Sequence, residues 1–485
     1  MKELKAEYCD ELLNIFPSFV LGVFYKLEIL RVTDCGSLEE VYELQAQGLE
    51  IKDTCVVAFQ LKEMRLFRLP KLKHVWNKHP QGNISFQTLR IVDVWECWSL
   101  KSLFPFSIAK GLPQLERLIV QECGVEEIVS KNEGLEQEIR FEFNHLSFIK
   151  LWILRSLKCF YPGKHTAMWP VLKKLRIHRC GKIKILGQLE SLIQQPLMEK
   201  VIPQLEEALI SSDEIAKICD GPYSEKLFCH LKVLWVSYYL NESVVSSFSF
   251  LRRFYNLEAL YVLHGNFKEL SLYEGNFGEE KEVWMLPKIK KLHLEYLCKV
   301  THLWKQESLL GHICASLETL EVWNCDSLIN LGSSSASFEN LTTLDVWKCK
   351  GIIELITSSK AQSLVRLVQM RIRECEMVKE VVASEGDDEA TYEIIFRELK
   401  RLELHCLASL RSFCSGNYTL KFPSLEQVIV SQCPRLNSFC HGALSTPKLQ
   451  RVQLEPTHYK GRWIGDLNAT VEQLYEEKVC YLIFF

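Results

Sequence analysis

The stretch LETLEVWNC at residues 317–325 decides the fold, because it is repeated as LTTLDVWKC at residues 341–349 and as LEQVIVSQC at residues 425–433. Each copy has an aliphatic residue at its first, fourth and sixth positions and a cysteine at its ninth. The alternation of the fourth and sixth residues predicts a short strand with one buried face. The three stretches therefore indicate a structural unit that recurs along the chain.

The same nine-residue frame runs through almost the whole sequence, with starts that are spaced by 28 residues on average. This spacing and the pattern L-x-x-L-x-L-x-x-C are typical of the leucine-rich repeat. Each unit must stack on its neighbours to bury its core. The frames predict an α/β leucine-rich-repeat solenoid, or horseshoe, of about 17 repeats, with a concave parallel β-sheet and convex loops or short helices, as one continuous array over residues 1–455. The frames start at Met1, Leu27, Leu61, Leu89, Leu115, Leu146, Leu172, Leu205, Leu231, Leu257, Ile289, Leu317, Leu341, Leu367, Leu399, Leu425 and Leu449.

The two ends of the array differ in sequence. Residues 461–478 depart from the frame, and there Asn468 and Thr470 are candidate N-cap residues, with Thr470 and Gln473 forming a Thr-x-x-Gln capping box. We expect residues 456–485 to form a C-terminal tail whose helix seals the last repeat. Met1 begins inside a frame with no cap ahead of it, so the chain is expected to be truncated at its front.

The cysteines follow the repeat. Nine of the 19 occupy the ninth position of the frame, where the chain turns from the strand toward the interior. A small, weakly hydrogen-bonding side chain suits a buried turn, so we predict structural thiols. Stacked free thiols would risk wrong pairing in an oxidising compartment, which favours a cytoplasmic location. The nine are Cys9, Cys35, Cys97, Cys123, Cys180, Cys325, Cys349, Cys375 and Cys433.

The composition excludes several classes of protein. The 485 residues are 47% apolar and 25% charged, with a formal net charge of −3 and interleaved signs, so we expect no nucleic-acid partner. No apolar run approaches the ~18 residues of a membrane-spanning helix, so no membrane span is predicted. The charged N-terminus is unlike a signal peptide.

Four long inserts between frames are acidic and carry glycine, at residues 43–53, 131–138, 274–282 and 384–393. Each is followed by a frame with leucine at the ninth position, which indicates a second, longer periodicity. Two interpretations of these loops stay open. They are solvated surface loops, or they form an electrostatic docking edge for a basic partner. The four leucines are Leu69, Leu154, Leu297 and Leu407.

The fifth and seventh frame positions should face the concave surface. Trp235 and Tyr261 take the fifth position, and Trp95 and Trp152 take the seventh. In a parallel sheet, four successive repeats should align a charge ladder beside a second column that contains two tryptophans. The aligned rungs either stack only on one another or form a site for a protein partner. The ladder is Glu321, Asp345, Arg371 and Glu403, and the column is Trp323, Trp347, Arg373 and His405.

Longer phrases resemble one family. Residues 86–118, 160–180, 250–262 and 465–478 are similar to the C-terminal leucine-rich-repeat domain of plant disease-resistance proteins of the coiled-coil, NB-ARC, leucine-rich-repeat (NLR) class, and the likeness covers essentially the whole chain. The resemblance implies a cytoplasmic immune receptor. In that family the repeat region recognises pathogen effectors or guarded host proteins and helps to hold a nucleotide switch off, so the partner would be an effector, a host guardee or the receptor's own switch domain.

The sequence departs from such a receptor because it contains no G-x-x-x-x-G-K-[ST] phosphate-binding motif. ADP or ATP would belong to the absent nucleotide-binding domain, so we predict no cofactor, no metal site and no enzymatic activity. Neither His405-Cys406 nor Cys440-His441 has the spacing of a metal site or a family nucleophile. A leucine-rich-repeat substrate receptor of an F-box ubiquitin ligase and a non-functional truncated receptor fragment remain alternatives. Oligomeric state is not predicted.

Overall fold

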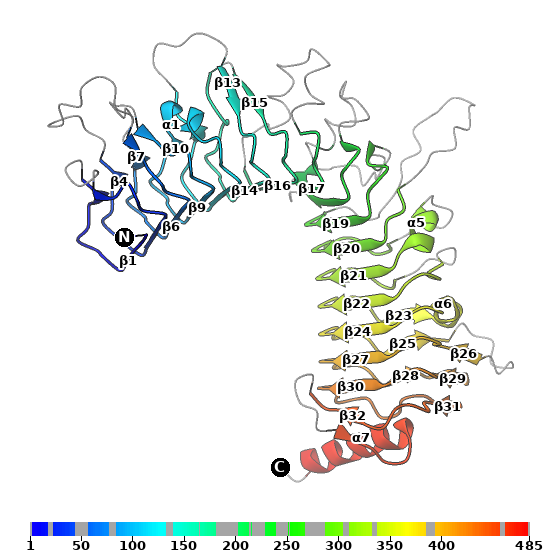
Figure 1. Ribbon diagram of the computed structural model, residues 1–485. Helices are drawn as coiled ribbons and strands as arrows, with labels where there is room; N and C mark the ends of the chain where they lie inside the picture. Colours follow the sequence, from blue (N-terminus) through cyan, green and yellow to red (C-terminus); the bar gives the residue numbers. More distant parts are fainter. Residues whose placement is uncertain are drawn as a thin grey trace, which may run out of the picture. The chain divides into compact units, whose positions relative to one another are not determined.

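The computed structural model describes most of the repeats as stacked turns (Figure 1). Its contacts divide the chain into two compact units, Met1–Leu231 and Lys232–Phe485, which are treated separately here. The prediction of one continuous array over residues 1–455 stays a prediction. The described residues are 2–17, 23–43, 57–76, 84–131, 139–163, 165–180, 202–212, 215, 228–238, 251, 253–266, 287–303, 310–331, 337–384, 393–455 and 461–483.

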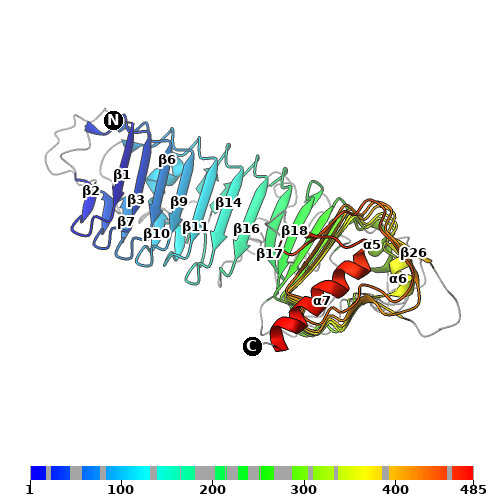
Figure 2. The same cartoon turned by 90° about the horizontal axis from the view of Figure 1, so that it is seen from below.

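The first unit is built on a parallel sheet in which each strand lies beside that of the next repeat (Figure 2). Residues with the same frame position face each other across the strands, as in the pair Arg65 and Asp93. In a typical strand, alternate residues are buried. These are the residues at the fourth and sixth frame positions, which agrees with the prediction. The strands are β1 (Glu3–Glu7), β3 (Ile29–Thr33), β6 (Glu63–Phe67), β9 (Ile91–Trp95), β11 (Arg117–Gln121), β14 (Phe148–Trp152), β16 (Lys174–His178) and β17 (Glu207–Ser211).

The second unit repeats this arrangement, and Figure 1 shows its strands stacked from β19 to β30. The last two strands, β32 (Val452–Gln453) and β33 (Gly461–Arg462), form an antiparallel pair. Every one of the seventeen predicted frames therefore carries a described strand, which confirms the predicted fold class. The other strands are β18 (Val233–Ser237), β19 (Ala259–Leu263), β20 (Lys291–Glu295), β21 (Thr319–Trp323), β22 (Thr343–Trp347), β24 (Gln369–Arg373), β27 (Arg401–His405) and β30 (Gln427–Ser431).

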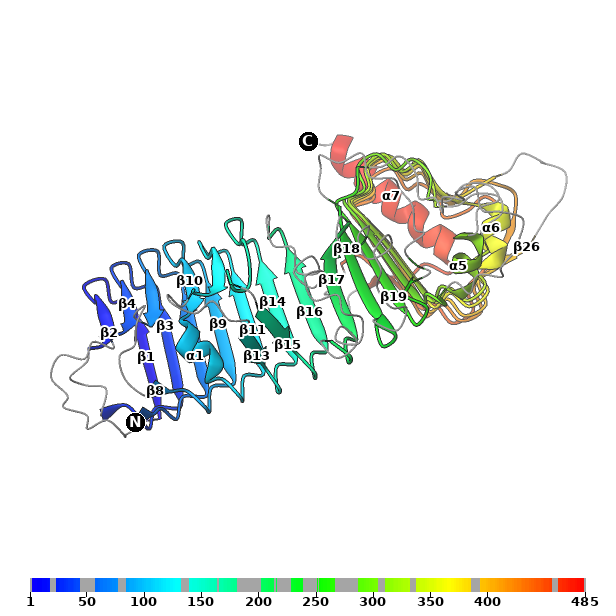
Figure 3. The same ribbon diagram turned by 90° about the horizontal axis from the view of Figure 1, so that it is seen from above.

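The return segments opposite the inner sheet consist mainly of short parallel strands, with few helices among the described residues (Figure 3). Aromatic side chains fill the core beneath them. Phe413 stacks on Phe439 with ring centroids 4.8 Å apart, and Phe396 stacks on Phe422 at 5.1 Å. The outer strands are β2 (Asn14–Phe16), β4 (Glu40–Tyr42), β5 (Val57–Ala58), β7 (His74–Trp76), β8 (Ile84–Ser85), β10 (Ser102–Phe104), β12 (Glu127–Val129), β13 (Ile139–Glu142), β15 (His165–Met168), β23 (Glu354–Thr357), β25 (Glu380–Ala383), β26 (Glu393–Ile395), β28 (Ser412–Cys414), β29 (Thr419–Lys421) and β31 (Leu444–Ser445), and the helices are α1 (Phe106–Lys110), α5 (Leu310–Ser316) and α6 (Ser358–Ser363).

A left-handed residue ends most inner strands, at the eighth frame position. Among the described residues, all fourteen non-glycine residues with positive φ occupy this position, including β-branched Ile153 at 53°. The backbone N–H at this position donates to the next repeat, as from Asn324 to the Trp347 carbonyl at 2.8 Å. The left-handed conformation reverses the chain and brings the ninth residue into the interior. Residues other than glycine adopt this conformation only at single positions.

The ninth position holds the predicted cysteines. Eight of the nine are buried, and their thiols donate to backbone carbonyls, as from Cys349 to Val322 at 3.4 Å and to Trp347 at 3.5 Å. The prediction is wrong for Cys9, which is exposed because its turn packs on a repeat at one side only among the described residues. Leucine replaces cysteine at the same position in four repeats, and these leucines are fully buried: Leu69, Leu154, Leu297 and Leu407.

The C-terminal helix α7 (Leu467–Ile483) lies across the end of the second unit (Figure 2). The predicted N-cap is wrong: Asp466 caps the helix, because its carboxylate accepts a 2.8 Å hydrogen bond from the N–H of Ala469. Thr470 is buried in the first turn and donates to the Asp466 carbonyl at 2.6 Å. Asn468 instead binds the repeat that starts at Leu425, since its side-chain oxygen accepts hydrogen bonds of 2.9 Å from the N–H groups of Phe439 and Cys440.

Almost all of each predicted acidic loop lies outside the described residues. These loops are 43–53, 131–138, 274–282 and 384–393, and the structure therefore does not decide between their two interpretations.

Candidate concave binding surfaces

The two predicted columns form on the inner sheet of the second unit. Across β21, β22, β24 and β27, the pairing places Glu321, Asp345, Arg371 and Glu403 in one row. The second row consists of Trp323, Trp347, Arg373 and His405, in the same register. The sequence thus predicted the alignment of these eight side chains correctly, while their role in binding a partner stays a prediction.

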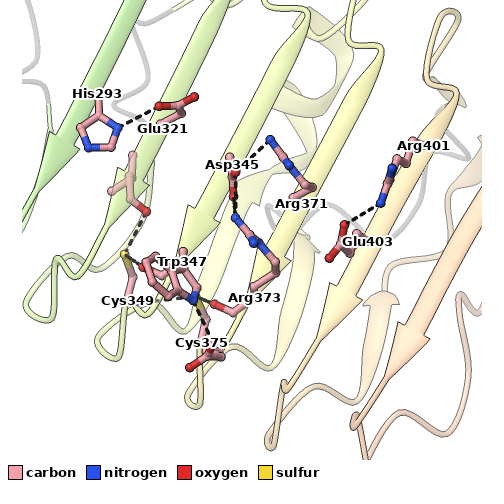
Figure 4. A network of polar contacts seen from close by, with 12 residues as sticks. His293, Glu321, Asp345, Trp347, Cys349, Arg371, Arg373, Cys375, Arg401 and Glu403 are labelled. Carbon is pink, nitrogen blue, oxygen red and sulfur yellow. Dashed lines mark hydrogen bonds and ion pairs between the residues drawn. The ribbon is translucent and has the colours of Figure 1, made fainter. Parts of the chain in front are cut away.

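Asp345 is the centre of the charge ladder (Figure 4). Its side chain is 2% exposed, and it accepts from Arg373 at 2.9 Å and from Arg371 at 3.1 Å. Two cations from one neighbouring strand therefore compensate one buried carboxylate, which is the condition under which a buried charge is tolerated. The next carboxylate, that of Glu403, pairs with Arg401 on its own strand at 3.3 Å.

Glu321, which is half-buried, forms a second ionic group with the buried His293. Lys291 donates to it at 2.8 Å, and Nδ1 of His293 lies 2.8 Å from its other oxygen. Nε2 of His293 lies 3.3 Å from Glu295, so both ring nitrogens face carboxylates, as in an imidazolium. Burial opposes both charges, but hydrogen bonds to the partners outweigh it: they lower the pKa of Glu321 to about 2 and raise the pKa of His293.

The low pKa of Glu321 makes stability depend on pH. Because the folded-state pKa of about 2 lies below the ordinary 4.5, this contribution is complete above pH 4.5 and is lost as the pH falls toward 2. We expect the stability advantage of the native chain over Glu321→Gln to shrink by about 1–2 kcal/mol between about pH 6 and about pH 3. Urea unfolding of both proteins at both pH values measures this difference. An advantage that does not change with pH would contradict the assignment.

The tryptophan pair occupies the middle of the second column. The rings of Trp323 and Trp347 meet edge to face, with centroids 5.4 Å apart. Trp347 Nε1 donates to Glu374 at 2.9 Å, whereas Trp323 Nε1 is buried with no hydrogen-bond partner. Both rings are half-buried, so only part of each ring is open to a partner. They offer a packed aromatic surface with one unsatisfied donor, and such donors are uncommon.

In the first unit, the two predicted tryptophans lie apart. Trp95 belongs to β9 and Trp152 to β14, with β11 between them. Trp95 contacts Phe67 edge to face at 6.3 Å, and Trp152 lies against His178 at 4.3 Å. They therefore form two separate aromatic contacts rather than one cluster.

The sequence reasoning missed a group of cations on the same face of the first unit. Arg117, Lys150 and Arg176 belong to the adjoining strands β11, β14 and β16. Arg117 takes the third frame position and the other two take the fifth. The signal was present in the frame, because basic residues recur at the positions that face the concave surface.

Thiol chemistry is disfavoured where cysteine and histidine adjoin. Cys406 Sγ lies 3.2 Å from Nε2 of His405, but burial and the nearby carboxylate of Glu374 raise the pKa of the thiol. Burial raises the pKa of Cys440 to about 11. Both shifts oppose the thiolate that a nucleophile or metal ligand requires.

The described residues show neither a metal site nor a membrane-spanning helix. They contain no cluster of three or more histidine, cysteine or acidic side chains that could hold a metal ion. No helix in the described part of the chain is both long enough and apolar enough to cross a membrane.

Comparisons with known proteins found one matching family and several similar solved structures. Residues 1–124, 204–336 and 330–453 match the family described as "Plant disease resistance protein RPS2-like, leucine-rich repeats". No curated protein matches the chain significantly. Similar solved structures include the mouse RP105/MD-1 complex (13% identity, 90% of this chain and 75% of that chain, TM-score 0.36), the TLR13–ssRNA13 complex (11%, 91% and 79%, 0.21) and the plant peptide hormone receptor RGFR1 in complex with RGF2 (10%, 92% and 97%, 0.18).

Proposed function

This chain belongs to the RPS2-like family of leucine-rich repeats of plant disease resistance proteins, and on that premise we propose that it is a protein-recognition module of plant innate immunity. The family match carries this proposal. The module would act as the repeat region of an intracellular NLR-type receptor and would sense a pathogen effector or a guarded host protein, or would contact the receptor's own switch domain.

The molecular features support recognition by surface contact. The inner strands present rows that contain tryptophan and arginine side chains, which are residue types that are enriched at the energetic centres of protein interfaces. We propose that the chain works without catalysis and without a nucleotide of its own; the lack of a phosphate-binding loop in its sequence supports the second part. The described cysteines are free thiols, which supports a reducing, cytoplasmic location.

The central tryptophan pair provides the first test. We expect Trp323→Ala combined with Trp347→Ala to reduce the recovery of specific partners at least tenfold, because buried aromatic anchors dominate interface energy. Tagged native and variant chains are compared by co-purification from plant tissue followed by mass spectrometry. Trp98→Ala is the matched control, because Trp98 is 54% exposed and lies outside the inner strands.

The outcomes test the recognition function and the position of the binding site separately. If the native chain retains no specific partner, the recognition function is contradicted. If the native chain and the double variant retain the same partners, recognition stands but the tryptophan pair is not its site. Circular dichroism must show the native fold in each variant before the recoveries are compared.

A further inference from the structure

The two inner sheets differ in how their charges are compensated. In the second unit, the carboxylates of Glu321, Asp345 and Glu403 each pair with a cation in the sheet. The ladder is therefore satisfied internally, and a partner would have to break ion pairs to use it. In the described part of the first unit, two cations of the inner face make no such pair.

These two cations are Arg117 and Lys150, which lie on the paired strands β11 and β14. The Arg117 guanidinium lies over the ring of Phe148 at 4.5 Å, and the Lys150 ammonium lies over the ring of Trp152 at 5.0 Å. Neither makes an ion pair with a carboxylate of any described residue. Arg117 is exposed and Lys150 is half-buried, so both charged groups are held over aromatic rings and remain reachable.

The neighbouring groups increase the excess of positive charge. Arg176 follows Lys150 directly in the fifth-position row, although it is already paired with Glu207. The one carboxylate of the row is that of Asp93, which attracts both cations but makes no ion pair with either, while its buried Oδ1 has no hydrogen-bond partner. Burial and the repulsion of Arg176 lower the pKa of Lys150, and burial raises the pKa of Asp93. A negative charge from outside would oppose the lowering of the Lys150 pKa.

The centre of this surface is apolar. Ile119 is half-buried and lies beside Lys150 on the neighbouring strand. Trp152 lies two residues further along β14. Neighbouring strands are ~4.8 Å apart. The cations, the aliphatic side chain and the indole ring therefore lie within a few square nanometres of the sheet surface. Such a surface matches a polypeptide that carries both carboxylates and apolar side chains.

We propose that Arg117, Ile119, Lys150 and Trp152 form a docking site, here called the β11–β14 site, for an acidic segment of a protein partner. Carboxylates of the segment would pair with Arg117 and Lys150, and an apolar side chain would lie on Ile119 and Trp152. A nucleic acid fits less well, because backbone binding requires many cations along a track and this row is interrupted by Asp93 and Ile119. The inference rests on the proposed recognition function and specifies the chemistry of a partner.

The test uses the full chain and three labelled probes. Fluorescence anisotropy at low salt measures the binding of fluorescein-labelled deca-glutamate, deca-lysine and a twenty-nucleotide poly-uridine RNA. The test variant is Arg117→Glu with Lys150→Glu. The matched control is Lys71→Glu with Arg155→Glu, which changes the net charge equally at exposed residues outside the inner strands. Thermal unfolding checks that both variants fold.

We expect deca-glutamate to bind the native chain and the control alike, to bind the test variant at least tenfold more weakly, and to lose affinity as salt increases. The proposal is overturned if deca-glutamate does not bind, if the two variants bind it equally, or if the RNA binds more tightly with the same dependence on Arg117 and Lys150. These outcomes do not depend on plant partners. A native chain that retains partners while the anisotropy test fails would overturn this inference alone.

Discussion

Deletion of residues 465–485 is expected to lower the free energy of unfolding of the second unit by roughly 5–9 kcal/mol. The deletion removes α7, whose side chains Leu467, Val471 and Leu474 are buried. Each such side chain contributes about 1.5–3 kcal/mol by leaving water. The loss also exposes the last repeat, because the end of a solenoid has no further neighbour to cover its core.

Urea unfolding monitored by circular dichroism measures this loss, and hydrogen exchange of β30 shows whether fraying begins at the cap. Glu472→Ala is the control, because Glu472 is exposed on the same helix and should change stability by less than about 0.5 kcal/mol. An unfolding curve for the deletion variant that superimposes on the native curve would show that α7 does not cap the array.

Asp345→Ala is expected to lower the free energy of unfolding of the second unit by about 3 kcal/mol. The substitution leaves Arg371 and Arg373 without their shared carboxylate, and their side chains are only 30% and 26% exposed. Removing one partner of a buried ion pair typically costs about 3–5 kcal/mol, and the partial exposure of the two arginines places this site at the lower end. The loss should be confined to the repeats around β22 and β24, because solenoid repeats contact only their neighbours.

A second set of variants identifies the cause. If the cost arises from the unpaired cations, adding Arg371→Met and Arg373→Met to Asp345→Ala should recover at least half of the lost stability. Hydrogen exchange of β22 and β24 provides the local readout. Asp326→Ala serves as the control, because Asp326 is exposed and lies outside the inner strands. Equal destabilisation by Asp326→Ala and Asp345→Ala would exclude the buried ion pair as the cause.

The repeat frame predicted the scaffold in detail. Leu320 and Val322 were expected to face the core, and both are buried. Because a parallel sheet with no register shift aligns equal frame positions, the same frame also predicted that Trp323 would lie beside Trp347. The burial of Cys349 followed from its ninth position for the same reason.

The sequence reasoning failed where a contact depends on residues far apart in the chain. Thr470 and Asn468 have the composition of N-caps, but Asp466 begins the helix and leaves Asn468 free to bind Phe439 and Cys440. A local capping motif does not reveal that the segment at Phe439 and Cys440 offers two backbone N–H groups to the side chain of Asn468. The exposure of Cys9 likewise depends on the lack of a second neighbouring turn among the described residues.

The sequence by itself determined the periodicity, the strands, the buried positions and the lateral alignment of side chains, because each of these follows from local spacing and stacking. Only the tertiary structure decided which aligned charges neutralise one another. Asp345 is paired with Arg371 and Arg373, whereas Arg117 and Lys150 lie over aromatic rings and make no ion pair with a carboxylate of the residues that the structure describes. Electrostatic pairing depends on distances of a few ångströms between flexible side chains, and a repeat frame defines the rows but not those distances.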